Sequence, residues 1–238
     1  MLPPMIRRTV VTAVLLATVG SLAAEPGDDA DDDPEVTDDA LPAPGGLGSA
    51  ATTLIAEAHR ELGAVRESHY AHHTVIDEPH GVFDYDCSGF VGYALKRVAP
   101  QAFGELVTAT RPRPLAKDFY AFFAKHDRVE HAADLVPGDI IVWLEPPAKH
   151  SRNTGHVMVV DQAPVAGANP GELVVSIIDS SHSGHGHADA RIRDHRNGLG
   201  AGSIVLLVDS DGKPTGYRWS LAPHSVRYAT AIALGRVP

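Results

Sequence analysis

The sequence has a single cysteine, Cys87, among its 238 residues. No disulfide can form within the chain, so the folded state depends on its hydrophobic core. Aromatic residues make up only 6% of the sequence, although the total hydrophobic content is 44%. This length and composition predict one folded domain with one core and are too small for two full domains.

The sequence also lacks any excess of positive charge. Its formal net charge is −10, and residues 25–47 contribute nine acidic residues and no basic one. Such a segment has too few apolar side chains to fold, so we predict a disordered acidic linker over residues 25–48. The rest of the chain is only mildly acidic, which argues against nucleic acid as a partner.

Long apolar runs are missing apart from Thr9–Leu22, which is short for a membrane span. Arg7 and Arg8 precede this run and small residues follow it, so residues 1–24 are predicted to be a secretory signal, with an uncleaved signal anchor as the alternative. We therefore expect a secreted, periplasmic or cell-envelope protein without stable membrane insertion after signal cleavage. A lone thiol in an exported protein indicates either pairing with another chain or catalysis.

The folded domain is predicted over residues 49–238. Apolar periodicity indicates helices from Ser49 to Leu62, from Cys87 to Val98 and after Pro114, with a long loop over residues 64–85. Strands are predicted at Ile140–Leu144, His156–Val160, Leu173–Ile178, Ile204–Val208, Gly216–Trp219 and Ala229–Leu234. Helices followed by strands favour an α+β fold, in which N-terminal helices pack on an antiparallel sheet of about five to six strands.

The position of Cys87 at the start of a helix suits a thiol nucleophile, since the free N–H groups and the helix dipole favour the thiolate. His156 begins a strand after Gly155, and its side chain is predicted to share a face with Met158 and Val160. If the cysteine helix covers that face, the imidazole meets the thiol. Asp179 ends the next strand and can hold the ring of His156. The alternative is a buried, inert cysteine.

Three short motifs carry a family resemblance. Asp86–Phe90 (DCSGF), Pro137–Ile140 (PGDI) and Thr154–Val157 (TGHV) occur in the order found in the NlpC-type cell-wall cysteine peptidases, and the chain resembles them over roughly Ser49 to His182. The resemblance implies a papain-like α+β domain with Cys87 as nucleophile and His156 as base. It also implies an exported enzyme that cuts peptidoglycan stem peptides, commonly between D-glutamate, or its amide, and the diamino acid.

The resemblance is less direct for the remaining site residues. The family has a histidine or another polar residue on the strand after the base, and Asp179 takes that place here, with His182 as the alternative third catalytic residue. Family precedent also implies that Asp86 and Ser88 contact the substrate amine and that Tyr70 lines the site. From the residues alone, Asp86 and Ser88 can equally be helix-capping residues, and Tyr70 an ordinary packing residue.

The glycine-rich stretch after Asp179 contains three histidines that could bind a metal ion, namely His182, His185 and His187. No fixed element sets their geometry, so we predict no metal and no other cofactor. The arginines that follow, Arg191 among them, are expected in surface salt bridges, with a substrate clamp as the alternative.

Three other functions remain open at this stage. An amidase or an acyltransferase can use the same thiol and imidazole, and a non-catalytic wall-associated protein with a histidine-rich metal-binding loop would use neither. We expect a monomer whose partner is the peptidoglycan stem peptide.

Overall fold

The computed structural model describes residues 50–126, 128–145 and 153–237. The predicted signal at residues 1–24 and the predicted linker at residues 25–48 lie outside the described residues. None of the described helices combines the length and the hydropathy needed to cross a membrane.

Three helices form where apolar periodicity predicts them: α1 (Ala50–Ala64), α2 (Cys87–Val98) and α4 (Ala116–Phe123). The sequence did not predict α3 (Pro100–Leu106), α5 (Ala190–Arg193) or the single-turn helices η1 (Glu78–His80) and η2 (Ala132–Asp134). Pro100 ends α2 as expected but also starts α3, because a first helical residue needs no N–H partner. The helices therefore follow the sequence pattern except where they are too short to show periodicity.

The sheet has seven antiparallel strands in the order β8-β7-β6-β5-β4-β3-β9. The strands are β3 (Ile140–Leu144), β4 (Gly155–Ala166), β5 (Glu172–Ser181), β6 (Gly198–Val208), β7 (Pro214–Arg218), β8 (Arg227–Ala229) and β9 (Ile232–Gly235). The prediction of five to six strands is too low, because the expected last strand is divided at Thr230 and Ala231. Its two halves pair with opposite edges of the sheet, β8 with β7 and β9 with β3.

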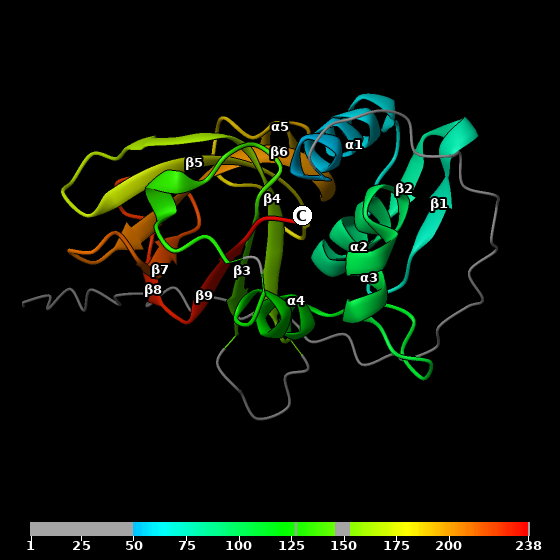
Figure 1. The fold of residues 1–238 in the computed structure, drawn as a ribbon. Coiled ribbons are helices and arrows are strands. Elements are labelled where there is room, and N and C mark those ends of the chain that lie inside the picture. The colour runs from blue at the N-terminus through cyan, green and yellow to red at the C-terminus, as the bar shows by residue number, and fades with distance from the viewer. Residues whose placement is uncertain (1–49, 127, 146–152, 238) are drawn as a thin grey trace, which may run out of the picture.

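A small two-stranded ribbon lies within the segment predicted as a long loop. It consists of β1 (Val75–Asp77) and β2 (Val82–Asp84), joined through η1 and Gly81, whose φ of 72° suits a residue without a side chain. Strands of three residues are too short for an alternating pattern to appear in the sequence, which explains the wrong prediction. Figure 1 shows the ribbon beside α2, on the side away from the large sheet.

The large sheet has a hydrophobic core on each face. Val157, Val159 and Ile178 face the helices and pack with side chains of α1, α2 and α4. On the other face, the ring of Trp143 on β3 stacks on that of Tyr217 on β7 with 3.9 Å between centroids. Because β3 and β7 are not neighbours in the strand order, this contact means that the sheet curls over its second core. Figure 1 shows α1 and α2 together on the other side, whereas Ala132 of η2 belongs to the second core.

The observed architecture is therefore α+β, with α1, α2 and α4 against a curled antiparallel sheet. Each large side chain buried in these two cores contributes about 2 to 3 kcal/mol. This burial fixes α2 against β4 and β5, the strands that carry His156 and Asp179.

Candidate active site

Cys87 is the first residue of α2, as predicted, and Asp86 is the residue that caps the helix. One carboxylate oxygen of Asp86 accepts the N–H of Gly89 at 2.7 Å. Cys87 is 4% exposed, and the backbone N–H of Val157 on β4 is close enough to the thiol to favour its ionised form. Because Val157 follows His156 in the chain, the thiol lies against β4 within one residue of the histidine.

The expected resting thiolate is wrong for this environment. Burial raises the pKa of Cys87 well above its usual range, and the negative charges of Asp86 and Asp179 raise it further. The N–H groups of Val157 and Ser88 favour the thiolate but do not compensate for these effects. Cys87 therefore rests as a thiol, and a separate group must take its proton before sulfur can act as a nucleophile.

His156 and Asp179 lie together as predicted. Nε2 of His156 is 2.7 Å from a carboxylate oxygen of Asp179, and both side chains are buried. Nε2 must donate to this carboxylate, which leaves Nδ1 of His156 as the basic nitrogen. The alternative third residue, His182, is exposed, and its ring meets that of Tyr70 at 6.2 Å. The contacts thus favour Asp179.

The thiol and the imidazole lie on different faces of the sheet. The condition set out from the sequence, that the cysteine helix covers the face of His156, is not met: α2 packs on Val157, while the ring of His156 meets Trp143 and Trp219 at centroid distances of 5.4 and 5.2 Å. The reason is alternation along β4, which puts successive side chains on opposite faces. Among the described contacts, no hydrogen bond joins Cys87 to His156.

His156 on β4 and Asp179 on β5 lie beyond the part over which these two strands pair with each other. The pairing of β4 with β5 ends at Val159 opposite Ile178, so the strand ends that carry His156 and Asp179 are not paired with each other. Backbone N–H groups lie in the plane of a sheet. The backbone N–H of Val157, which favours the thiolate of Cys87, and the hydrogen bond from His156 to Asp179 both lie at this end of the two strands.

Asp86 and Ser88 have hydrogen-bond and ion-pair partners within the protein. Arg113 lies 2.7 Å from both carboxylate oxygens of Asp86, Nδ1 of His72 lies 3.2 Å from one of them, and the Ser88 hydroxyl donates to Asp86 at 2.9 Å. Burial opposes ionisation of Asp86, but the hydrogen bonds from His72, Arg113 and Gly89 outweigh it and lower its pKa to about 2. The capping interpretation thus describes these contacts.

Tyr70 is half-buried beside this cap. Its backbone N–H donates to Asn197 at 3.1 Å, and its ring meets His72 edge-on at 5.5 Å. The same ring also meets that of His182, so Tyr70 connects the segment before β1, to which it belongs, with the loop after β5. Tyr70 is thus linked through His72 to Asp86, the residue before Cys87.

The three candidate metal-binding histidines do not come together. His182 and His187 are exposed, whereas His185 is buried, with Nδ1 3.0 Å from the carbonyl oxygen of Trp219 and Nε2 3.0 Å from Asp179. Within residues 50–126, 128–145 and 153–237, no group of three or more His, Cys, Asp or Glu side chains is arranged to hold a metal ion. The described loop therefore does not assemble the metal site considered from the sequence.

Arg191 is buried beside Asp179 and Asp189, although the sequence suggested a surface position. One guanidinium nitrogen lies 2.8 Å from an oxygen of each carboxylate, and another donates to Ser181 and to the carbonyl of Gly198. Burial of Asp179 opposes its ionisation, but the charges of Arg191 and His185 hold its pKa well below the usual range. Asp179 is therefore a carboxylate at neutral pH.

The alternating glycines of β6 are the sequence signal for these buried groups. A Cβ at Gly200 would collide with the guanidinium of Arg191, and a Cβ at Gly202 would lie 2.8 Å from Cβ of His185. Glycine at every second position leaves one face of a strand bare, which lets other side chains approach the backbone closely. This pattern could have indicated that polar side chains lie over β6.

The chain is similar in sequence to a viral protein. An uncharacterized protein of Acanthamoeba polyphaga mimivirus is 32% identical over 160 residues, which cover 59% of this chain and 70% of the viral protein. The chain belongs to the family of that viral protein. No protein-family model matches the chain, and no solved structure matches it. The family relationship is thus shown by sequence, while the activity has to be argued from the site.

Proposed function

We propose that this protein is an exported cysteine peptidase with a papain-like, NlpC-type site that hydrolyses amide bonds in peptidoglycan stem peptides. The main support is the arrangement of Cys87 at the start of α2, against the residue that follows His156, with Asp179 2.7 Å from the ring of His156. A nucleophile, a base and a group that orients the base are the parts that covalent amide hydrolysis requires.

Proton transfer and attack occur together in the proposed reaction, because Cys87 rests as a thiol. Nδ1 of His156 takes the thiol proton while sulfur bonds to the amide carbonyl, and backbone N–H groups at the head of α2 stabilise the oxyanion. The C–N bond then breaks as His156 returns the proton to the departing amine. Water, deprotonated by His156, hydrolyses the thioester and restores the thiol. Asp179 keeps the ring in the tautomer that these transfers need.

The substrate assignment depends on the resemblance of the three motifs, and the location depends on the predicted signal at residues 1–24. An amidase or an acyltransferase would form the same thioester and differ only in the amide attacked or in the acceptor that releases the acyl group. The products of the reaction therefore distinguish these functions.

The test is digestion of purified peptidoglycan by the full chain, with the soluble muropeptides analysed by mass spectrometry. We expect wild type to release fragments that have gained one water across a stem-peptide bond, and Cys87→Ala and Asp179→Asn to release none. His182→Ala is the matched control and should keep the activity. Identical products from wild type and Cys87→Ala would refute the proposal, while acyl transfer to an added amine without gain of water would favour the acyltransferase.

A further inference from the structure

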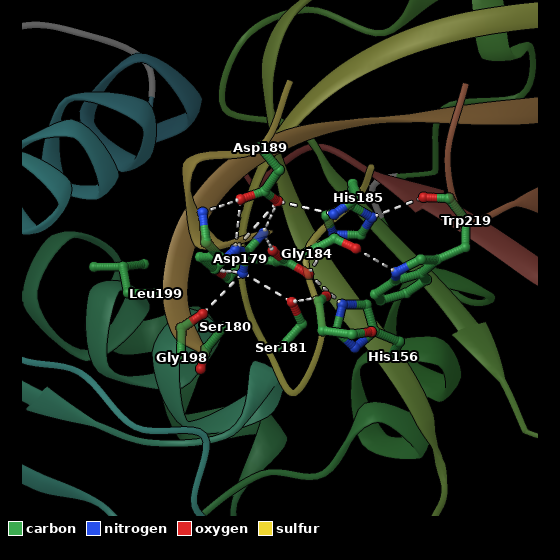
Figure 2. Close-up of polar contacts among 12 residues, drawn as sticks. His156, Asp179, Ser180, Ser181, Gly184, His185, Asp189, Gly198, Leu199 and Trp219 are labelled. Atoms are coloured by element: carbon green, nitrogen blue, oxygen red, sulfur yellow. Dashed lines mark hydrogen bonds and ion pairs between the residues drawn. The ribbon is translucent and has the colours of Figure 1, made fainter. Parts of the chain in front are cut away.

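A cluster of charged side chains is buried beside His156, on the face of the sheet away from α2 (Figure 2). Its four members, here called the charged quartet, are Asp179, His185, Asp189 and Arg191, and each is at most 3% exposed. They come from β5, from the loop after β5 and from α5. Buried charges are costly unless they are balanced within the cluster, so the protonation of each member has consequences for the others.

The hydrogen bonds of His185 require both of its ring nitrogens to carry protons. Nδ1 lies 3.0 Å from the carbonyl oxygen of Trp219, which can only accept. Nε2 lies 3.0 Å from Asp179, which Arg191 also holds through its other carboxylate oxygen at 2.8 Å. A neutral imidazole has one donor and would leave one of these contacts without a proton. His185 is therefore an imidazolium.

The quartet then contains two negative and two positive groups. The neighbouring titratable groups are His156, which shares an oxygen of Asp179 with His185, and Cys87, which rests as a thiol. With the carboxylates already balanced, a proton on Nδ1 of His156 would add an uncompensated buried charge. We propose that the charged quartet is electrically balanced, with His185 as an imidazolium, and so leaves His156 uncharged as the base of the site.

This proposal depends on the proposed function only for the role given to His156. His185 and Arg191 are positioning residues: they act through Asp179 and touch neither the thiol nor a reacting atom in the described contacts. Their effect differs from simple packing, because a change in quartet charge must move the pH at which His156 takes up its proton.

Two substitutions of opposite charge separate these effects. Arg191→Gln removes a positive charge and should raise the titration midpoint of His156, whereas Asp189→Asn removes a negative charge and should lower it. A nearby unit charge inside a protein changes the titration midpoint of a group by about one pH unit or more. A merely structural role would move both variants in the same direction or not at all.

The experiment is a long-range proton–nitrogen NMR correlation of imidazole signals in the ¹⁵N-labelled full chain, with assignments from His156→Gln and His185→Gln. At pH 7.5 we expect both ring nitrogens of His185 to be protonated and His156 to be protonated at Nε2 alone. The opposite shifts of the His156 midpoint in Arg191→Gln and Asp189→Asn complete the prediction.

An unprotonated ring nitrogen on His185 at pH 7.5 would overturn the proposal, even if neither charge variant folds, because this result comes from wild type. A His156 midpoint that moves the same way in both variants would also overturn it. These spectra need no substrate. Failure of the muropeptide assay would therefore refute the proposed function and leave the proposal for the charged quartet standing. Failure of the NMR prediction would refute the proposal for the quartet and leave the proposed function standing.

Discussion

Glu61 on α1 is a buried carboxyl group that the proposed reaction does not use, and it makes stability depend on pH. Its side chain is fully buried; one oxygen accepts the Tyr85 hydroxyl at 2.7 Å, and the other has no hydrogen-bond partner among the described residues. Burial raises the pKa of Glu61 from 4.5 to about 8, although the hydrogen bond from Tyr85 opposes the shift. Glu61 therefore carries its proton in the folded protein at neutral pH.

The sign of the effect follows from proton counting. Between about pH 4.5 and pH 8 the unfolded chain has lost the Glu61 proton and the folded chain has kept it, so the unfolded state binds fewer protons. The free energy of unfolding then falls as pH rises, by about 1.4 kcal/mol per pH unit from this group. By pH 8 the loss reaches about 4 kcal/mol, a large part of the stability of an ordinary domain.

Glu61→Gln should remove this dependence, because glutamine is neutral at every pH and can still accept from Tyr85. We expect the variant to match wild type within about 1 kcal/mol at pH 5 and to be more stable by about 4 kcal/mol at pH 8. Urea unfolding curves at pH 5, 6, 7 and 8 measure the difference. Glu105→Gln, at an exposed position of α3, is the control and should follow wild type. Parallel curves for wild type and Glu61→Gln would refute the reasoning.

Three further predictions concern the site. Iodoacetamide should label Cys87 at pH 7.5 about 100-fold more slowly in the native protein than in urea, by mass spectrometry, because the thiol is buried and its pKa is raised; equal rates would contradict its described burial. Asp179→Asn leaves the charged quartet with one uncompensated positive charge and should reduce the free energy of urea unfolding by about 3 to 5 kcal/mol, whereas a change near zero would mean that the quartet is not buried. Gly155→Ala should cost about 2 kcal/mol or more in the same assay, since φ is 130° and a Cβ would collide with the carbonyl of Trp143; Gly63→Ala, whose Cβ would meet nothing within 4 Å, is its control.

The sequence predicts the local features of the site well. A helix that begins at Cys87 follows from apolar residues at helical spacing, and β3 was predicted at its observed bounds, Ile140–Leu144. The contact between His156 and Asp179 was also predicted, because adjacent antiparallel strands bring their side chains together. Such inferences need only short stretches of sequence and one turn between strands.

Features set by distant parts of the chain could not be predicted in this way. The position of β9 beside β3 joins residues about 90 positions apart, and no local pattern records that pairing. The face of β4 that α2 covers is decided by the packing of two cores, which placed Cys87 and His156 on different sides. Arg191 was expected in water because charged residues usually are, and only tertiary contacts with Asp179 and Asp189 hold it inside.

The place of β9 in the sheet also determines when the molecule can finish folding. β3 needs a partner on each side, and one of these is made by Ile232–Gly235, almost a hundred residues later in the chain. During synthesis, β3 and β4 therefore leave the ribosome with an open edge, and Ile141 and Trp143 remain without their neighbours on β9. A chain cut before Ile232 would keep that edge exposed and prone to pair with other chains. The sheet around His156 is thus complete only once Ile232–Gly235 has joined it.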